Sequence, residues 1–179
     1  MHVFLTGEIQ VGKSTAIRRF LADTDAQADG FLSHIVSVDA AKPEAGRNLY
    51  LARFDTQIGE TDSVLAASNV AASHSTQGFA PFDVYTDVFD THGANLVRSA
   101  GRHGLILMDE LGRMEENAEA FKRAVFERFD GNIPILGVVK MVQTPFLDAV
   151  RAHPNVRVVM VTEQNRDDVP RLIREALKR

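Results

Sequence analysis

Cysteine is absent from this 179-residue sequence, which excludes disulfides, a thiolate metal site and a cysteine nucleophile. The sequence also lacks any apolar run close to the roughly 20 residues that a membrane-spanning helix needs. Its N-terminus shows no basic segment, apolar core and cleavage site of the kind that a secretory signal contains. We therefore expect a cytoplasmic protein that does not interact with membranes.

An excess of positive charge is missing as well. Lysine and arginine together number 20 and aspartate and glutamate 24, so the formal net charge is −4. General affinity for nucleic acid depends on clustered positive charge, and strong nucleic-acid binding is therefore not expected. The six histidines show no spacing typical of a metal site. With 45% hydrophobic residues, the chain is expected to form a single domain over residues 1–179.

A phosphate-binding motif is present near the start of the sequence. The run GEIQVGKS matches the P-loop pattern G-x-x-x-x-G-K-[ST]. Residues 2–6 have the apolar composition of a buried strand, and apolar residues at helical spacing follow the motif. A strand, a glycine loop and a helix N-terminus in this order form an anion site. The predicted nucleotide-binding residues of this segment are Gly7, Glu8, Ile9, Gln10, Val11, Gly12, Lys13, Ser14 and Thr15.

Individual P-loop residues have distinct chemical roles. Gly7 and Gly12 carry no side chains that would keep backbone N–H groups from converging on a phosphate. Lys13 is a predicted catalytic residue, expected to contact the β- and γ-phosphates of ATP, GTP or another nucleoside triphosphate. The Ser14 hydroxyl is expected to bind Mg²⁺, which bridges those phosphates.

Strands and helices alternate along most of the chain, which predicts an α/β fold of three layers around a mostly parallel sheet. Continuous apolar runs are typical of strands that are buried on both faces of such a sheet. These runs span residues 105–108, 133–139 and 156–161, and helices are predicted over residues 93–100 and 114–129 and after residues 144 and 168.

An antiparallel hairpin is predicted at one edge of this sheet. Residues 30–38 and 48–54 have the composition of strands, and the segment between them contains proline and glycine. Residues 55–81 are poor in large apolar side chains and are expected to form a mobile loop near the nucleotide, with a short strand as a further element that the segment could contain. Residues 84–89 are expected to form a short strand or a turn.

Two carboxylates directly follow the apolar run at residues 105–108. We expect the sheet to place this strand beside the P-loop strand, so that Asp109 binds Mg²⁺ together with Ser14. Glu110 is then placed to orient or deprotonate an attacking water, and is a predicted catalytic residue. The alternative is that the two acidic residues simply end a strand in solvent.

Two cations are candidates for stabilising the charge of a transferred phosphoryl group. Arg113 is the nearest cation in sequence to the acidic pair, and Lys140, at the end of the next strand, is the second candidate. Exposed surface positions are the alternative for both. Glu115 and Glu116 are expected in the first turn of the following helix, where the helix dipole favours acidic residues, and metal binding is the alternative for this pair.

Two fragments are similar to motifs of switch GTPases. The run DELG from Asp109 contains D-x-x-G, and the run NRDD at residues 165–168 is similar to N-K-x-D. Asn165 and Arg166 are therefore candidates for contacting the base or the ribose of the nucleotide. Capping of the last helix by Asn165 or Asp167 is the structural alternative.

The combined motifs resemble those of the small P-loop nucleoside-triphosphatases first described from thermophiles, a family that includes the cancer-related nucleoside-triphosphatases. The runs that carry the resemblance are FLTGEIQVGKST, GF at residues 30–31, LILMDELGRME, ILGVV and VTEQNRD. The resemblance implies a RecA-like core and Mg²⁺-dependent hydrolysis of several nucleoside triphosphates. It also implies that Asp109 lies on the metal side and that Glu110 is the base.

Three functions remain open at this point. The leading interpretation is a nucleoside-triphosphate phosphohydrolase that converts NTP and water to NDP and phosphate. The second is a kinase, since the same core transfers phosphate to the hydroxyl of a nucleoside, a nucleotide or an RNA end when water is excluded. The third is a GTP-dependent switch or binding module.

Overall fold

The computed structural model describes residues 1–42, 45–70 and 82–178. Within these residues, eight strands form one sheet in the order β5-β4-β3-β2-β6-β7-β1-β8. Strands β2, β6, β7, β1 and β8 are parallel, whereas β3, β4 and β5 continue the sheet in antiparallel pairing. The strands are β1 (His2–Thr6), β2 (Asp29–Ser37), β3 (Arg47–Asp55), β4 (Gly59–Ser68), β5 (Asp83–Val84), β6 (Ile106–Leu111), β7 (Ile135–Val139) and β8 (Val156–Met160).

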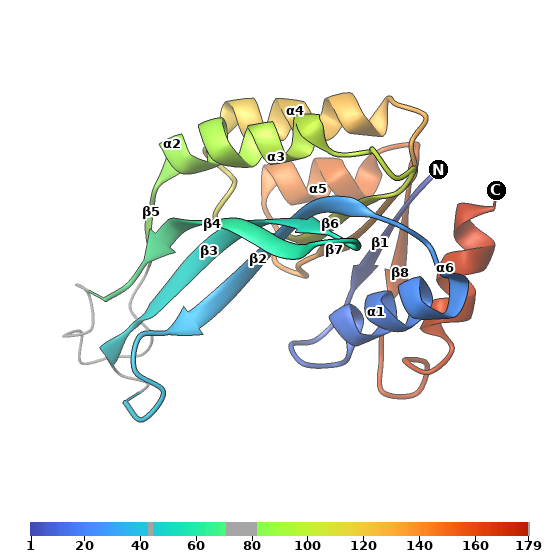
Figure 1. The fold of residues 1–179 in the computed structure, drawn as a ribbon, viewed down its shortest axis with the longest axis horizontal. Coiled ribbons are helices and arrows are strands. Elements are labelled where there is room, and N and C mark those ends of the chain that lie inside the picture. The colour runs from blue at the N-terminus through green and yellow to red at the C-terminus, as the bar shows by residue number, and fades with distance from the viewer. Residues whose placement is uncertain (43–44, 71–81, 179) are drawn as a thin grey trace.

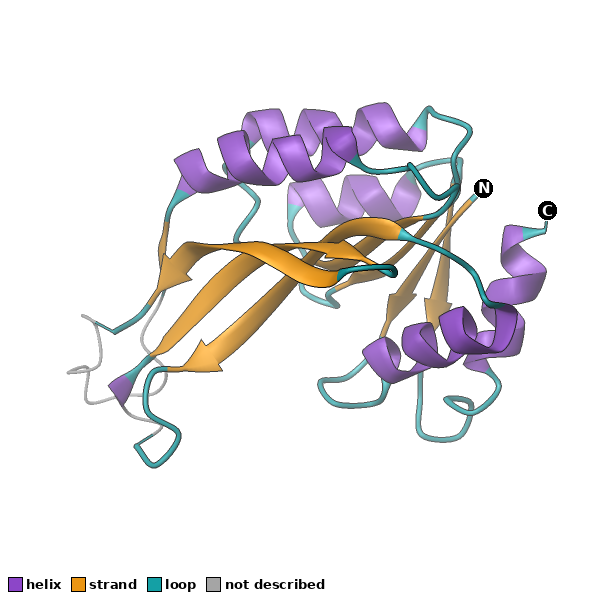
Figure 2. Ribbon diagram, viewed as in Figure 1, coloured by secondary structure: helices purple, strands orange, loops and turns teal. Residues whose placement is uncertain are grey.

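Helices cover both faces of the sheet, as the three-layer prediction requires (Figures 1 and 2). Each helical layer packs on its own hydrophobic cluster, one containing Ile17 and Ile173 and the other Phe121 and Phe146. Among the described residues, no helix is both long and apolar enough to cross a membrane. One face carries α1 (Lys13–Thr24) and α6 (Val169–Leu177), and the other carries α2 (Thr86–Val88), the π-helical η2 (Phe89–Gly93), α3 (Ala94–Ser99), α4 (Glu119–Phe129) and α5 (Pro145–Ala152).

The strand that ends in the acidic pair does not lie beside the P-loop strand, so this prediction is wrong. Strand β7 lies between β1 and β6, and Gly137 of β7 pairs with Phe4 on one side and Met108 on the other. All five residues of β7 are buried, which suits a position flanked by strands on both sides and by helices on both faces. A Cβ atom on Gly137 would lie 2.4 Å from the Phe4 ring, so glycine permits this close packing.

Strands β2 to β5, here called the wing, continue the sheet in antiparallel pairing, and the far end of the β2–β3 hairpin extends beyond the helices (Figure 1). The predicted antiparallel pairing of β2 with β3 is confirmed, with Ile35 opposite Leu49. Strand β4 lies in the segment predicted as a loop that could contain a short strand, and its ten residues make it longer than that prediction. Register shifts in its pairing with β3 interrupt the alternation by which a strand is recognised from sequence. Residues 71–81, the rest of the predicted loop, lie outside the described residues.

Two helical segments begin at positions other than those predicted. Helix α2 begins at Thr86, inside the segment predicted as strand or turn, and continues through η2 into α3. This segment is too short for its apolar spacing to separate a strand from a helix. Helix α4 begins at Glu119 rather than at residue 114, because turns occupy the residues that follow β6.

Two buried carboxylates link β2 and β3 to the loop before β6, at the end of the sheet opposite the P-loop. Asp29 begins β2 and Asp55 ends β3, and the Arg102 guanidinium donates to both at 2.9 Å. A backbone hydrogen bond from Gln57, together with the His103 ring 3.0 Å away, lowers the pKa of the Asp55 carboxyl. The charges of both carboxylates are therefore compensated, and the base of the wing is held firmly.

Candidate active site

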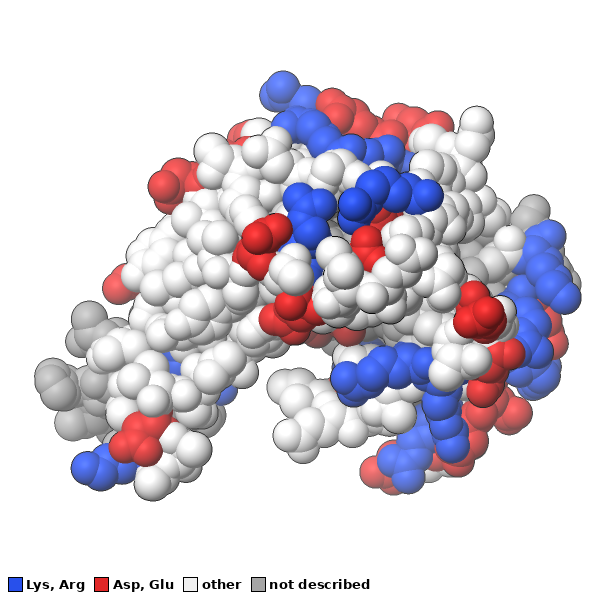
Figure 3. Space-filling model, in the orientation of Figure 1, with Lys and Arg blue, Asp and Glu red and all other residues white. Residues whose placement is uncertain are grey.

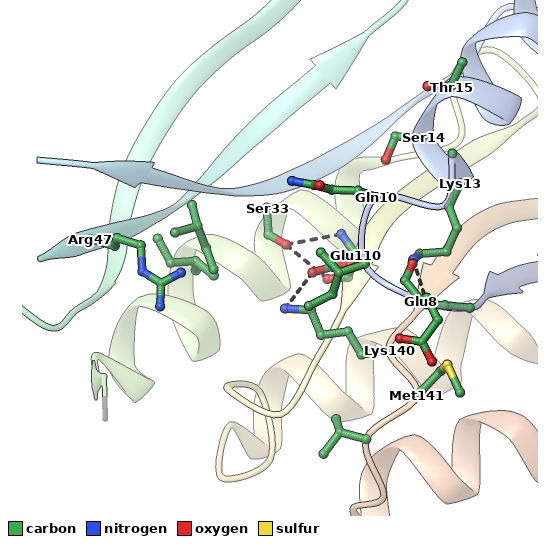
Figure 4. A pocket seen from close by; sticks show the side chains of 16 residues that line it. Glu8, Gln10, Lys13, Ser14, Thr15, Ser33, Arg47, Glu110, Lys140 and Met141 are labelled. Atoms are coloured by element: carbon green, nitrogen blue, oxygen red, sulfur yellow. Dashed lines mark hydrogen bonds and ion pairs between the residues drawn. The ribbon is translucent and has the colours of Figure 1, made fainter. Parts of the chain in front are cut away.

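A cavity of about 690 Å³ lies at the carboxyl ends of β1, β6 and β7 and extends to the wing (Figure 4). The molecular surface is hollowed between the wing and the P-loop (Figure 3). Ligands of parallel α/β sheets bind at this end of the strands, so the cavity is the candidate site. Its lining residues are Gly7, Glu8, Ile9, Gln10, Gly12, Lys13, Ser14, Thr15, Ser33, Ile35, Arg47, Leu49, Glu110, Lys140, Met141 and Val142.

The P-loop connects β1 to α1 and has the backbone of an anion site. Gly12 precedes the first helical residue with φ at 109°, a conformation that glycine adopts without steric cost. A Cβ on Gly7 would lie 2.4 Å from the Val161 carbonyl oxygen, so glycine is needed there as well. Lys13 Nζ donates to the carbonyl oxygens of Gly7, at 2.8 Å, and Glu8, at 2.7 Å. The ammonium group thus lies over the loop that a phosphate would occupy.

All the predicted P-loop residues line the cavity except Val11. The Val11 side chain is buried in the core cluster that also contains Val161 and Ile17. An apolar side chain at this position anchors the loop to the protein interior and leaves the backbone free to face the cavity.

Asp109 and Ser14 lie close together even though β7 separates β6, which contains Asp109, from β1, the strand before the P-loop. The Ser14 hydroxyl is close enough to the Asp109 carboxylate to lower its pKa. Burial is the larger effect and raises the pKa of Asp109, and Ser14 opposes this rise only in part. The pair therefore offers hard oxygen donors at a buried position where a cation would stabilise the carboxylate charge.

Glu110 faces the cavity and is held by two neighbouring strands. Its Oε1 lies 2.7 Å from Lys140 Nζ, at the end of β7. Its backbone N–H donates to Ser33 Oγ, and the Ser33 hydroxyl donates to its carbonyl oxygen, each at 3.2 Å. Figure 4 shows Glu110 and Lys140 directed toward each other, between the P-loop and the wing. Such fixed geometry suits a group that receives a proton from a nucleophile.

Of the two candidate cations, Lys140 lines the cavity and Arg113 does not. Arg113 is exposed in the turn after β6. Lys140 is brought to the acidic pair because β7 is the immediate neighbour of β6, and its backbone N–H also donates to the Leu111 carbonyl at 3.0 Å.

Neither Asn165 nor Arg166 lines the cavity. Asn165 Oδ1 accepts from the Thr162 N–H at 2.8 Å, and its Nδ2 donates to the Met160 carbonyl at 2.9 Å. The amide therefore braces the loop after β8 and does not cap α6. Arg166 is exposed, although its stem lies near Gly12, 3.9 Å from where a Cβ there would stand. The described contacts thus give no support to base recognition of the GTPase type.

The prediction that Glu115 and Glu116 lie in the first turn of α4 is wrong, because both residues precede the helix. Glu115 is only 2% exposed, and its Oε2 accepts from the Gly112 N–H at 2.9 Å. Burial raises the pKa of Glu115 from its ordinary value of 4.5 to about 7. Glu116 instead faces the start of α5, where its carboxylate accepts from the Phe146 N–H at 3.4 Å.

The variant Glu115→Gln is expected to become more stable relative to the wild type as the pH rises. Between its ordinary pKa and about 7, Glu115 is ionised in the unfolded chain but protonated in the folded chain. Wild-type stability therefore falls across this interval, and above it ionisation of this group causes no further change with pH. Glutamine cannot ionise, so the variant gains about 3 kcal/mol relative to the wild type between pH 4.5 and 8.

Urea unfolding at several pH values measures this difference in the free energy of unfolding. Glu116→Gln is the matched control, because it makes the same substitution at the adjacent residue, which is partly exposed whereas Glu115 is buried. If the stability of Glu115→Gln runs parallel to that of the wild type over this pH range, the raised pKa is wrong.

A family model described as NTPase matches residues 2–174 of the chain. The chain belongs to this NTPase family. Similar proteins include nucleoside-triphosphatase THEP1 of Methanosarcina acetivorans, 30% identical over 97% of this chain and 94% of that protein. THEP1 of Thermotoga petrophila is 26% identical over 99% and 93% of the two chains. The cancer-related nucleoside-triphosphatase homolog of Mus musculus is 26% identical over 94% and 92%.

Two solved structures of proteins with NTPase-family names have the same fold. The crystal structure of THEP1 from Aquifex aeolicus superposes with a TM-score of 0.72 at 21% identity and covers both chains completely. The solution structure of a human cancer-related nucleoside triphosphatase gives a TM-score of 0.65 at 22% identity, over 98% of this chain and 96% of that one. The fold of the NTPase family therefore extends over the whole described chain.

The wing contributes cavity residues that the sequence did not indicate. Ser33 and Ile35 come from β2, and Arg47 and Leu49 come from β3. Their participation depends on the register of the hairpin and on the position of β2 beside β6, and no local motif reports either.

Proposed function

We propose that this protein is a Mg²⁺-dependent nucleoside-triphosphate phosphohydrolase, with water as the nucleophile and broad base specificity. The observation that carries the proposal is the position of Glu110, which Lys140 holds at 2.7 Å in the same cavity as the P-loop residues Lys13 and Ser14. The names of the relatives, nucleoside-triphosphatase in each case, agree with this reaction.

Phosphate binding follows from the P-loop. The backbone N–H groups between Gly7 and Ser14 and the N-terminus of α1 face the cavity and attract the phosphate charge. Lys13 exchanges its two bonds to loop carbonyls for bonds to phosphate oxygens, which carry full negative charge.

Mg²⁺ fits the oxygen donors of Ser14 and Asp109. In the part of the chain that the structure describes, no group of three or more histidine, aspartate and glutamate side chains could hold a metal. One carboxylate and one hydroxyl nevertheless suffice for Mg²⁺, which is commonly bound by one or two carboxylates plus substrate phosphates. When bound, Mg²⁺ neutralises charge on the β- and γ-phosphates.

Glu110 acts as the general base in this proposal. The oxygen of a water bonds to the γ-phosphorus, the bond from that phosphorus to the bridging oxygen breaks, and the water proton passes to the Glu110 carboxylate. Lys140 keeps the carboxylate pointed into the cavity. Because Arg113 is exposed, we assign the assisting cation to Lys140.

The bonding of Asn165 supports the proposal of broad base specificity. Its amide, the predicted base contact, is bonded to backbone groups around the end of β8. A base that meets no positioned donor and acceptor pair is discriminated weakly, and among the described residues Asn165 does not supply such a pair.

Removal of divalent metal with EDTA is expected to abolish phosphate release, and excess Mg²⁺ is expected to restore it.

Ser14→Ala is expected to raise the Mg²⁺ concentration for half-maximal rate about tenfold, because a bond to a charged group is lost. Phosphate release is measured with ATP, GTP, CTP and UTP, alongside the Mg²⁺ dependence of binding of a fluorescent GTP analogue. Thr24→Ala, at the other end of α1, is the matched hydroxyl control. Turnover that persists in EDTA would remove the metal from the proposal.

A further inference from the structure

The cavity extends on both sides of Glu110. On one side lies the P-loop, and on the other lie Ser33 and Arg47 of the wing (Figure 4). The strands of these two residues, β2 and β3, also supply Ile35 and Leu49 to the cavity lining. These four wing residues are here called the wing pocket. The triphosphate is bound on the P-loop side, so Glu110 stands between the γ-phosphate and the wing pocket.

The wing pocket is one continuous face of the hairpin. Ile35 is directly opposite Leu49 in the β2–β3 register, and Arg47 is two residues from Leu49 on the same face. Ile35 is 41% exposed, whereas Leu49 is 4% exposed and packs in the core, so Ile35 supplies most of the open apolar surface. The Arg47 guanidinium also lies over the Phe82 ring, 5.8 Å from its centre.

Hydrolysis alone gives no role to this apolar surface. An attacking water needs only Glu110 and the space beside it, whereas Ile35 and Leu49 make the wing side of the cavity partly apolar. Apolar walls favour the carbon skeleton of an organic ligand over water. Glu110 lies between the P-loop and Arg47 of the wing, so a group bound on the wing side would lie near its carboxylate (Figure 4).

A flat apolar surface beside polar groups matches the chemistry of a nucleoside. A planar base packs against paired aliphatic side chains of neighbouring strands, and the sugar hydroxyls match the hydroxyl of Ser33. Ser33 is also the residue that bonds to the Glu110 backbone, at 3.2 Å. A sugar hydroxyl near Ser33 is therefore also near the general base.

We propose that the wing pocket binds a nucleoside and that the protein transfers the γ-phosphoryl group to its hydroxyl as a second activity beside hydrolysis. The hydroxyl oxygen bonds to the γ-phosphorus, the bond to the bridging oxygen breaks, and the hydroxyl proton passes to Glu110. The products are a nucleoside monophosphate and an NDP. This inference rests on the phosphate site of the proposed function.

The test uses GTP as donor and adenosine as acceptor, so that AMP has only one source. Phosphorus NMR measures AMP formed and inorganic phosphate released, and their ratio is compared among variants. The wild type is expected to form AMP. Ile35→Asp is expected to lower the ratio of AMP to phosphate about tenfold, because it places a charge on the apolar surface that receives the base.

Val36→Asp is the matched control. Val36 is the next residue of the same strand, is 46% exposed, and points to the opposite face of the wing. Its ratio of AMP to phosphate is expected to equal that of the wild type. Equal ratios in the two variants and the wild type would overturn the assignment of the pocket.

The outcomes for the wild type separate this inference from the proposed function. Cleavage of GTP to inorganic phosphate alone, with adenosine, cytidine or uridine present, contradicts the second activity and leaves hydrolysis in place. Cleavage only in the presence of a nucleoside supports the wing pocket and contradicts hydrolysis. Absence of cleavage in every condition contradicts both.

Discussion

The variant Glu110→Gln is expected to bind nucleoside triphosphate like the wild type and to lose most of its turnover. Glutamine keeps the shape of the side chain and still accepts a bond from Lys140, which lies 2.7 Å from the carboxylate in the wild type. It cannot take a proton from water at neutral pH. Loss of a general base lowers kcat by about 10²- to 10⁴-fold, and steady-state phosphate release measures this directly.

Glu116→Gln is the control for this variant. Glu116 is a carboxylate close in sequence, but it faces the start of α5 rather than the cavity. Its kcat is expected to match the wild type, and a fluorescent GTP analogue should bind all three proteins equally. Turnover of Glu110→Gln close to that of the wild type would remove Glu110 from the mechanism.

Replacement of Lys13 by alanine is expected to weaken nucleotide binding itself. Lys13 is the cation of the P-loop, and its ammonium group lies within 2.8 Å of the carbonyl oxygens of Gly7 and Glu8. A hydrogen bond to a charged group contributes about 1.5 to 3 kcal/mol, so the dissociation constant should rise about 10- to 100-fold. Equilibrium titration with the fluorescent analogue measures this change, and kcat should fall as well.

Lys178→Ala controls for the loss of one positive charge. Lys178 is exposed at the end of α6 and does not line the cavity. Its dissociation constant is expected to equal that of the wild type. Equal weakening in both variants would mean that net charge, rather than the P-loop lysine, governs binding.

The parallel core was predictable because its signals are local. Each inner strand is a run of apolar residues, such as the sequence ILGVV of β7, and the P-loop connects β1 to α1 within a single motif. Pro145 follows Thr144, whose hydroxyl accepts from the Leu147 N–H at 3.2 Å, and this cap marks the start of α5 in the sequence.

The order of the strands was not predictable from the same signals. Nothing in the apolar run before Asp109 indicates that Met108 pairs with Gly137 of β7 rather than with Phe4 of β1. Strand pairing is a long-range property, and β6 and β1 have similar apolar sequences. The consequence for the site is direct, because the insertion of β7 brings Lys140 beside Glu110.

The wing was the least predictable part of the site. In β4, Ala66 and Ala67 are both buried although they are adjacent, so the alternation expected of a strand is lost. Ser33 and Leu49 lie in predicted strands, but their position in the cavity depends on the register of the hairpin. Glu115 was assigned to a helix end from its sequence, whereas its burial depends on the turns that precede α4.

The position of β1 between β7 and β8 determines when the phosphate site forms during synthesis. β1 and the P-loop lie near the beginning of the described chain. The two strands that flank β1 come much later, β7 at residues 135–139 and β8 at residues 156–160. Contacts between such distant segments form late, since the chain between them must first be made and closed. A nascent chain that ends before β8 leaves one edge of β1 unpaired and Gly7 without the carbonyl of Val161 beside it. The P-loop is therefore synthesised long before the two strands that hold it in its binding conformation.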